Sequence, residues 1–480
     1  MAVSSYAVKQ VGTLEDGYVN NANCIYVNRD KMSKTIGGNV MIKKTHKFCA
    51  ALGSAFLVTL LAFTLTACDN DSESTDDLTT AEENQPTVTA TPQPTPQQVA
   101  GATPPTDSPS DARQRPDYVI ILGQQISTDA TEVSFMFDVL LDEDAASLAY
   151  LTELTSLNLH SSQLTDISFL SGMSNLQFLN LHDSRIADFA PLAALTNLTN
   201  LSISFDQNTD FTPISGLSNL EFLSLNGAWS EIAVLPPSLA YLAGLTNLTH
   251  FSIELLGNQL TELSPIGTLS NLTELNATNN AIADLSTFAG ANMPNLWRLS
   301  LVMNFIRDLS PLAQAYFPNL TDLTLDDNVI SDVTPLAHFT SLHVLRIPNN
   351  PIGDISALGG LTNLAALIIN NTAVSDISAV RGMTNLFSLL ADDNYISDLS
   401  PLEGIQSIRT LGLQNNLISD ISALASLTDL HSLDARYNMI TDLSPLANLH
   451  GWGPSDLRLY DNPITDWSPV DHVDWVFGRP

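Results

Sequence analysis

Two histidines in this sequence have a spacing that could support metal chemistry. His160 and His182 lie 22 residues apart, and Asp183 directly follows the second of them. If both histidines occupy the same outward position on adjacent strands, their Cβ atoms lie about 5 Å apart, close enough for a divalent metal to bridge the rings. Because no third ligand is obvious from the sequence, we expect an incidental stack of two rings and no metal site.

The sequence contains no familiar arrangement of catalytic residues. GxSxG, HExxH, CxxC and P-loop patterns are absent, and residues 451–456 (GWGPSD) match only the first half of a dinucleotide fingerprint. The Asp-Asp-Asn runs at 326–328 and 392–394 lack the Gly and Glu that an EF-hand calcium loop needs. We therefore expect no enzyme activity and no cofactor, and we interpret the acidic side chains as a solvated face.

Length and charge exclude further classes of protein. A chain of 480 residues is too long for one compact core unless the core grows by repetition. Residues 68–480 hold 11 arginines, 48 acidic residues and no lysine, a balance of −37. A surface of this sign repels nucleic acid and anionic lipid headgroups, so we expect neither to bind there.

Residues 41–67 have the layout of a secretory signal, with three lysines ahead of a long apolar run. The run closes with Leu65-Thr66-Ala67-Cys68, which resembles the lipobox of bacterial lipoproteins. That resemblance implies cleavage before Cys68, lipidation of this cysteine, and anchoring to a membrane of the bacterial cell envelope, whether periplasmic or surface-exposed. The alternative is a plain transmembrane anchor, since about 20 apolar residues can span a bilayer.

Two further segments flank this signal. Residues 1–40 form a long, weakly charged head, and we expect translation to begin at Met41. Residues 68–116 are rich in Ser, Thr, Pro and acidic residues, and they lack the apolar side chains that offset ordering entropy. We expect a disordered tether that begins at the lipidated cysteine and holds the remainder roughly 40 Å from the membrane.

Residues 323–339 (LTLDDNVISDVTPLAHF) belong to a unit that recurs every 22 to 24 residues. Leu323 and Leu325 alternate with polar residues, the pattern of a strand buried on one face. We expect Thr334 to cap a short helix and Pro335 to take its first position. Because one unit cannot bury its own apolar face, the units are expected to stack into a solenoid.

An asparagine recurs at a fixed offset after the strand. A buried Asn side chain can satisfy backbone groups of neighbouring coils, so the repeat predicts a row of hydrogen bonds, which we term the asparagine ladder. Its expected members are Asn258, Asn280, Asn304, Asn328, Asn350, Asn394, Asn416, Asn438 and Asn462. Earlier units are looser and place Ser162, Ser184, Asp206 and Ala228 at this position.

The unit resembles the leucine-rich repeat of bacterial internalins, LTNLTxLxLxxNxIxDLSPLxxL, and residues 269–286 and 408–427 carry it nearly intact. The resemblance implies a leucine-rich-repeat solenoid of about 14–15 repeats. Its concave face is a curved parallel β-sheet, and its convex face carries short 3-10 or irregular helical segments. We place an N-terminal cap and degenerate first repeat at 117–156, the repeats at 157–470 and a C-terminal cap at 471–480. An insertion at 229–245 is expected to bulge outward.

Outward strand positions are mostly Ser, Thr, Asn or Asp, and the exceptions predict where a partner binds. Ile368 and Leu390 are expected to touch side by side in water, as exposed apolar neighbours at interaction surfaces do. Arginine and tyrosine, types common in binding hot spots, follow toward the C-terminus. The predicted site comprises Arg346, Ile368, Leu390, Asp392, Gln414, Arg436, Tyr437, Arg458 and Tyr460. The alternative is that Ile368 and Leu390 reflect drift in a degenerate unit.

The resemblance to internalins implies adhesion or recognition at the cell envelope. We expect a monomer that binds a protein or glycan partner through its concave sheet and contacts the membrane through the lipid on Cys68. The alternative is a structural envelope solenoid without a dedicated ligand.

Overall fold

The structure is a computed structural model that describes residues 115–479, apart from 136–139, 161–162, 187, 206–209, 228–238, 255–259 and 454–455. Several sequence predictions lie outside these residues: the signal, Cys68, nearly all of the tether, Asn258, Ser162, Asp206, Ala228 and most of the expected bulge. The chain divides into two units, 1–106 and 107–480, and every described residue belongs to the second. Among the described residues, none of the helices has the length and apolar character needed to span a membrane.

The described chain begins with an antiparallel hairpin of β1 (Tyr118–Ile121) and β2 (Gln124–Ser127). Leu122 and Gly123 form its two-residue turn with φ values of 48° and 77°, the left-handed conformation that tight hairpins favour. The short helix α2 (Asp142–Ala145) follows further along the chain, after the first strand of a second, larger sheet.

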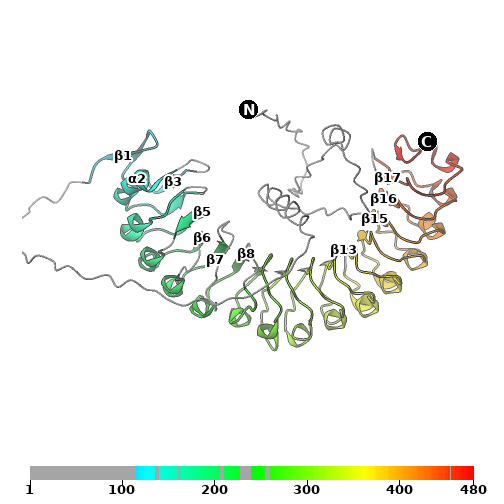
Figure 1. The fold of residues 1–480 in the computed structure, drawn as a ribbon, viewed down its shortest axis with the longest axis horizontal. Coiled ribbons are helices and arrows are strands. Elements are labelled where there is room, and N and C mark those ends of the chain that lie inside the picture. Colours follow the sequence, from blue (N-terminus) through cyan, green and yellow to red (C-terminus); the bar gives the residue numbers. More distant parts are fainter. Residues whose placement is uncertain are drawn as a thin grey trace, which may run out of the picture. The chain divides into compact units, whose positions relative to one another are not determined.

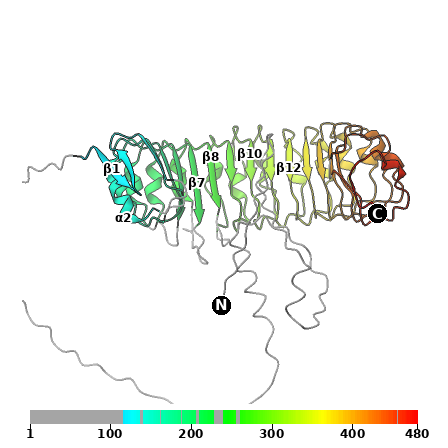
Figure 2. The ribbon, with the colours of Figure 1, turned by 90° about the horizontal axis from the view of Figure 1, so that it is seen from above.

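Sixteen strands within the described residues form this second sheet, and neighbours in the sheet are consecutive in the chain (Figure 2). All pairs are parallel, with Leu345, Leu367, Leu389 and Leu411 in register on adjacent strands. The strands are β3 (Glu132–Ser134), β4 (Ser156–Asn158), β5 (Phe178–Ile186), β6 (Asn200–Phe205), β7 (Phe222–Gly227), β8 (His250–Glu254), β9 (Glu274–Asn276), β10 (Arg298–Ser300), β11 (Asp322–Thr324), β12 (Val344–Arg346), β13 (Ala366–Ile368), β14 (Ser388–Leu390), β15 (Thr410–Gly412), β16 (Ser432–Asp434), β17 (Leu457–Arg458) and β18 (Val476–Phe477).

Short 3-10 helices return the chain on the outer side of the curve, opposite the sheet (Figure 1). They are η2 (Ala146–Tyr150), η3 (Ser168–Gly172), η4 (Ala190–Ala194), η5 (Thr212–Gly216), η6 (Ala240–Gly244), η7 (Ile266–Thr268), η8 (Ser286–Phe288), η9 (Leu312–Gln314), η10 (Thr334–Leu336), η11 (Ser356–Gly360), η12 (Ser378–Gly382), η13 (Ser400–Leu402), η14 (Ser422–Ser426), η15 (Ser444–Leu446) and η16 (Ser468–Val470).

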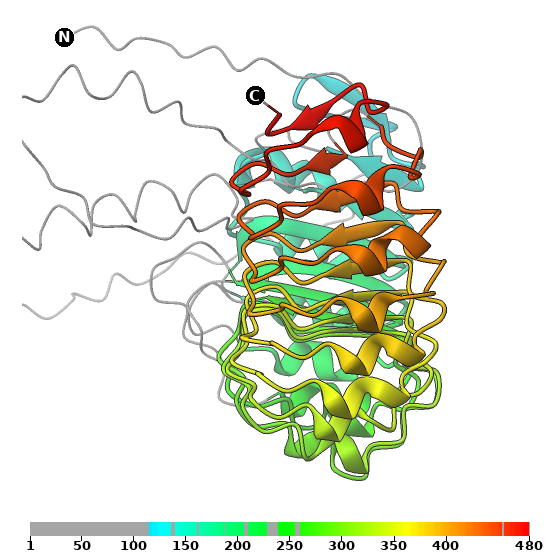
Figure 3. The same cartoon turned by 90° about the vertical axis from the view of Figure 1, so that its right-hand side faces the viewer.

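The core is one continuous stack of leucine and isoleucine layers between the sheet and the 3-10 helices. Each coil contributes the same inward positions, such as Leu411, Leu413, Ile418 and Leu424, all of which are buried. Figure 3 shows the coils stacked along the unit, so each coil buries its apolar side chains against its two neighbours. The parallel sheet and the 3-10 helices confirm the predicted fold class. The segment 471–480 adds β18, which pairs with β17.

The predicted cap at Thr334 was wrong by one residue. Thr334 is the first residue of η10 and Pro335 the second, and Thr334 makes no cap. Its backbone N–H instead donates to Oδ1 of Asp332 at 2.8 Å. An aspartate readily accepts from the N–H two residues ahead, so in this unit Asp332 serves as the acceptor of the turn. The same contact joins Asp308 to Ser310, Asp354 to Ser356, Asp398 to Ser400 and Asp442 to Ser444.

Candidate binding surface

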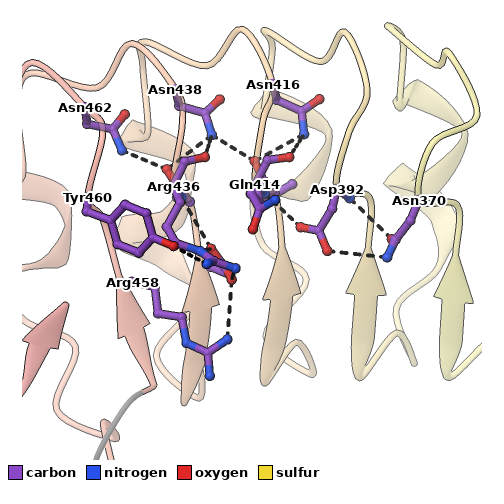
Figure 4. Close-up of polar contacts among 12 residues, drawn as sticks. Asn370, Asp392, Gln414, Asn416, Arg436, Asn438, Arg458, Tyr460 and Asn462 are labelled. Carbon is purple, nitrogen blue, oxygen red and sulfur yellow. Dashed lines mark hydrogen bonds and ion pairs between the residues drawn. The ribbon is translucent and has the colours of Figure 1, made fainter. Parts of the chain in front are cut away.

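The asparagine ladder runs beyond the carboxyl ends of the strands and links successive coils (Figure 4). Seven of its predicted members are buried and Asn462 is half-buried; the buried ones are Asn280, Asn304, Asn328, Asn350, Asn394, Asn416 and Asn438. Each side-chain amide donates to a backbone oxygen one coil earlier, as from Asn438 to Leu413 at 2.8 Å (Figure 4). At Thr372 the amide is missing, and Oγ1 donates to the oxygen of Ile369 instead. Outward strand positions are thereby presented on a rigid backbone.

Sequence reasoning missed a second regularity. The residue directly before each ladder position that the structure describes has a positive φ, for example Asn349 (56°), Asp393 (57°) and Tyr437 (55°). Several of these residues also bond across coils: Asn349 Nδ2 donates to Asp327 Oδ1 at 2.9 Å, and Asn371 Nδ2 donates to Asn349 Oδ1 at 3.0 Å. Asn and Asp tolerate this conformation well, which accounts for their frequency at the position.

The apolar pair on β13 and β14 is adjacent but does not stand in water. Ile368 and Leu390 are register partners, yet Ile368 is only 7% exposed and Leu390 is half-buried. Gly412, the register partner of Leu390 on β15, explains part of this burial. A Cβ at Gly412 would lie 3.1 Å from Leu390 Cδ2 and from both carboxylate oxygens of Asp392. Because Gly412 has no side chain, Leu390 and Asp392 can lie over β15. The expectation that Ile368 is exposed was therefore wrong.

Arg346, the last residue of β12, forms an ion pair with Asp326. Its Nη2 lies 2.7 Å from Asp326 Oδ2, and its Nε donates to the same oxygen at 3.2 Å. Asp326 Oδ1 is buried with no hydrogen-bond partner among the described residues. In the sheet, β13 lies between this pair and the coil of Asp392, and β13, β14 and β15 lie between it and the coil of Arg436.

Asp392 and Gln414 are joined through the backbone. The N–H of Gln414 donates to Asp392 Oδ1 at 2.8 Å, and Asn370 Nδ2 lies 3.4 Å from Oδ2 (Figure 4). Burial raises the pKa of Asp392 to about 6, although the hydrogen bond from Gln414 opposes the shift. Gln414 itself is half-buried.

Arg436 is the centre of a cluster at the C-terminal end of the sheet. Its Nε and Nη2 donate to the two carboxylate oxygens of Asp434 at 2.6 and 2.5 Å, and its Nη1 donates to the hydroxyl of Tyr460. The guanidinium also lies over the Tyr460 ring, 5.0 Å from its centroid. The hydrogen bonds that Arg436 donates to Asp434 raise the pKa of Arg436 further above its ordinary value. Arg436 is therefore charged and fixed in place at any physiological pH.

Two more predicted residues join this cluster. Arg458 Nη1 lies 3.4 Å from Asp434 Oδ2 (Figure 4). Tyr437 packs edge-on against Tyr460, with ring centroids 5.5 Å apart. We call Asp434, Arg436, Tyr437, Arg458 and Tyr460 the Arg–Tyr cluster. Sequence reasoning missed Asp434, although its place two residues before Arg436 on an outward strand position was a usable signal.

The histidines predicted to stack do so at the other end of the sheet. The rings of His160 and His182 have centroids 5.1 Å apart and an interplanar angle of 25°. Asp183 lies beside both, with Oδ1 3.1 Å from His182 Nδ1 and Oδ2 3.8 Å from His160 Nε2.

Comparisons with known proteins agree with this architecture. A family model of leucine-rich repeats (2 copies) matches residues 152–194 and 406–448. No curated protein matches the chain in sequence. The repeats are leucine-rich repeats, and the fold is a leucine-rich-repeat solenoid.

Three solved structures illustrate the similarity. An internalin of Listeria monocytogenes is 29% identical, with a TM-score of 0.52 over 69% of this chain and 89% of that one. A leucine-rich-repeat protein of Leptospira interrogans is 21% identical, with a TM-score of 0.61 over 69% and 86%. The leucine-rich-repeat ectodomain of an Arabidopsis thaliana membrane receptor kinase, in complex with Casparian strip integrity factor 2, is 21% identical, with a TM-score of 0.53 over 71% and 45%.

Proposed function

We propose that this protein is a lipid-anchored receptor or adhesin of a bacterial cell envelope that binds a protein partner on its concave sheet. Leucine-rich-repeat proteins generally serve as scaffolds for protein recognition, and they are typically not enzymes. The lipobox-like Leu65-Thr66-Ala67-Cys68 supports the anchor, and the tether would hold the solenoid clear of the membrane.

The Arg–Tyr cluster is the observation that carries the proposed binding site. Binding hot spots are enriched in arginine and tyrosine, and affinity rises when such side chains are already held in one conformation. Arg436 is fixed by Asp434 and Tyr460, while Tyr437 stays 46% exposed and Arg458 half-exposed. The cluster thus combines an ordered charge with accessible aromatic surface.

The test is crosslinking of the full-length protein to extracts of its own cell surface, followed by identification of the captured partner. The variant carries Arg436→Ala with Tyr460→Ala, and we expect at least tenfold less capture, as the loss of two hot-spot residues of about 1–2 kcal/mol each implies. Ile368→Asp is unsuitable, since Ile368 is buried and a charge there would damage the fold.

Arg298→Ala with Phe222→Ala is the matched control, because these residues lie on β10 and β7 of the same face. The control should capture as much partner as the wild type. Equal capture by the cluster variant would contradict this binding site. If the folded wild type captures no protein, the result would favour the alternative of a structural envelope solenoid without a dedicated ligand. Capture of a glycan alone would mean that the partner is a glycan and not a protein.

A further inference from the structure

We propose that His160, His182 and Asp183 form a binding site for a divalent transition-metal ion such as Zn²⁺. The site lies at the N-terminal end of the sheet, away from the Arg–Tyr cluster. It goes beyond the proposed function and does not depend on it.

The two imidazoles are brought together by strand register. β4 and β5 pair in parallel with Asn158 opposite Asn180, so His160 and His182, each two residues further on, fall on neighbouring coils. Asn158 Oδ1 accepts the backbone N–H of His160 at 3.2 Å, and Asn180 Oδ1 accepts that of His182 at 3.0 Å. The same local contact thus fixes the backbone of both histidines before any ion binds.

Asp183 supplies the third ligand because of its backbone conformation. On an extended strand, the residue after His182 would point to the opposite face. Asp183 instead has a φ of 64°, and its backbone N–H donates to Ser204 Oγ at 2.8 Å. This left-handed residue turns its carboxylate back toward the two rings. The sequence pattern alone could not show that three candidate ligands converge.

The distances between ligand atoms fit a shared ion. His182 Nδ1 is buried and makes no hydrogen bond within the described part of the chain, although Asp183 Oδ1 lies only 3.1 Å away. Two ligands on one tetrahedral ion, with bonds of about 2.0–2.1 Å, lie about 3.3 Å apart. One atom from each of the three residues falls within 4.8 Å of the others, so modest side-chain rotation completes the site.

The donor set selects the class of ion. Two imidazole nitrogens and one carboxylate suit Zn²⁺, Ni²⁺, Co²⁺ or Cu²⁺, whereas Ca²⁺ and Mg²⁺ prefer oxygen ligands throughout. Three protein ligands leave a coordination position for water or for a side chain of a partner. The strongly acidic surface of the chain also raises the local concentration of cations.

The full-length chain, purified in detergent without a polyhistidine tag, is dialysed against Zn²⁺, and the bound metal is measured by mass spectrometry. We expect the wild type to retain one equivalent, and His160→Ala with His182→Ala to retain none. Asp183→Asn should retain less Zn²⁺ than the wild type. Binding of Co²⁺ should give visible ligand-field absorption in the wild type, and added Zn²⁺ should remove it.

His250→Ala with His450→Ala is the matched control, because it removes two histidines elsewhere and should keep the bound equivalent. All variants should melt at the wild-type temperature without metal, since the three ligands lie at least partly exposed. A wild type that retains no Zn²⁺ and shows no Co²⁺ absorption would overturn the proposal. Retention of the full equivalent by the variant that lacks both ligand histidines would overturn it as well.

Discussion

The side-chain nitrogen of Asn416 donates a 2.9 Å hydrogen bond to the backbone oxygen of Ala391, one coil earlier in the chain. The same nitrogen donates to the oxygens of Leu413 and Gln414, and Oδ1 accepts the N–H of Ile396 at 2.9 Å. A single side chain therefore contacts four backbone groups, with its two N–H hydrogens shared among three oxygens, and joins neighbouring coils. A solenoid whose coils touch only their neighbours depends on such links for its rigidity.

Replacing Asn416 should damage the fold far more than replacing its neighbour. We expect Asn416→Leu to lower the free energy of unfolding by about 3 kcal/mol, because buried backbone groups lose their partner. Gln414→Ala, on the outward face of the same coil, should cost less than about 0.5 kcal/mol. Urea unfolding followed by circular dichroism measures both values. Equal losses would mean that the side chain of Asn416 is not the link between coils.

Gly478 is expected to be essential for the last strand pairing. A Cβ at this position would lie 2.4 Å from the backbone nitrogen of Tyr460, and the φ of 107° is one that side chains rarely adopt. Gly478→Ala should therefore expose the end of the sheet to hydrogen exchange and cost more than about 2 kcal/mol.

Gly353→Ala is the matched control for this prediction. Gly353 also has a positive φ, 71°, but a Cβ there would meet nothing within 4 Å. Gly353→Ala should lower the free energy of unfolding only by the backbone strain of about 1 kcal/mol. It should leave the hydrogen exchange of the β18 amides unchanged. If Gly478→Ala and Gly353→Ala lower the free energy of unfolding equally, the close approach of Gly478 to Tyr460 does not contribute to stability.

Asp392 should make stability depend on pH. Burial raises its pKa from 3.8 to about 6 in the folded state, so the folded protein binds the proton more tightly than the unfolded chain does. The stabilising contribution of the protonated carboxyl is complete below pH 3.8 and is lost as the pH rises through about 6.

Asp392→Asn removes this titration. Relative to the wild type, its free energy of unfolding should rise on the order of 2 kcal/mol between about pH 4 and pH 8. Unfolding curves of both proteins at several pH values provide the measurement, and Asp393→Asn serves as a neighbouring control. A difference that stays constant with pH would show that Asp392 titrates normally.

The anchor is tested at Cys68. Cys68→Ser should abolish lipidation, because no other side chain at the expected cleavage site can form the thioether bond to the lipid. The variant should lose the mass of the lipid and leave the detergent phase on phase partitioning. Cys49→Ser, within the apolar run, should remain lipidated. A Cys68→Ser chain that is cleaved and still partitions with detergent would rule out the lipobox.

The sequence by itself determined the architecture of the repeats. Each unit contains its own alternating leucines, its asparagine and, in many units, a Ser/Thr-Pro pair. Every unit must also bury the same apolar face against the next unit. One unit such as 323–339 therefore predicts the parallel sheet, the outer helical turns and the asparagine ladder. The secretory signal and its lipobox-like Leu65-Thr66-Ala67-Cys68 were also inferred from local order alone, and they stay a prediction.

Only the tertiary structure decided which outward side chains are exposed and what they contact. Ile368 is buried because Leu390 is its partner on the next strand and Gly412 leaves space beyond it, a relation between residues 22 and 44 positions apart. Arg436 is held by Asp434 of its own coil and by Tyr460 of the next coil. Asp183 faces the two histidines through its left-handed φ, whereas alternation alone would place it on the other face. Alternation sets the face of a residue, but its neighbours on adjacent strands and its own backbone angles set its surroundings.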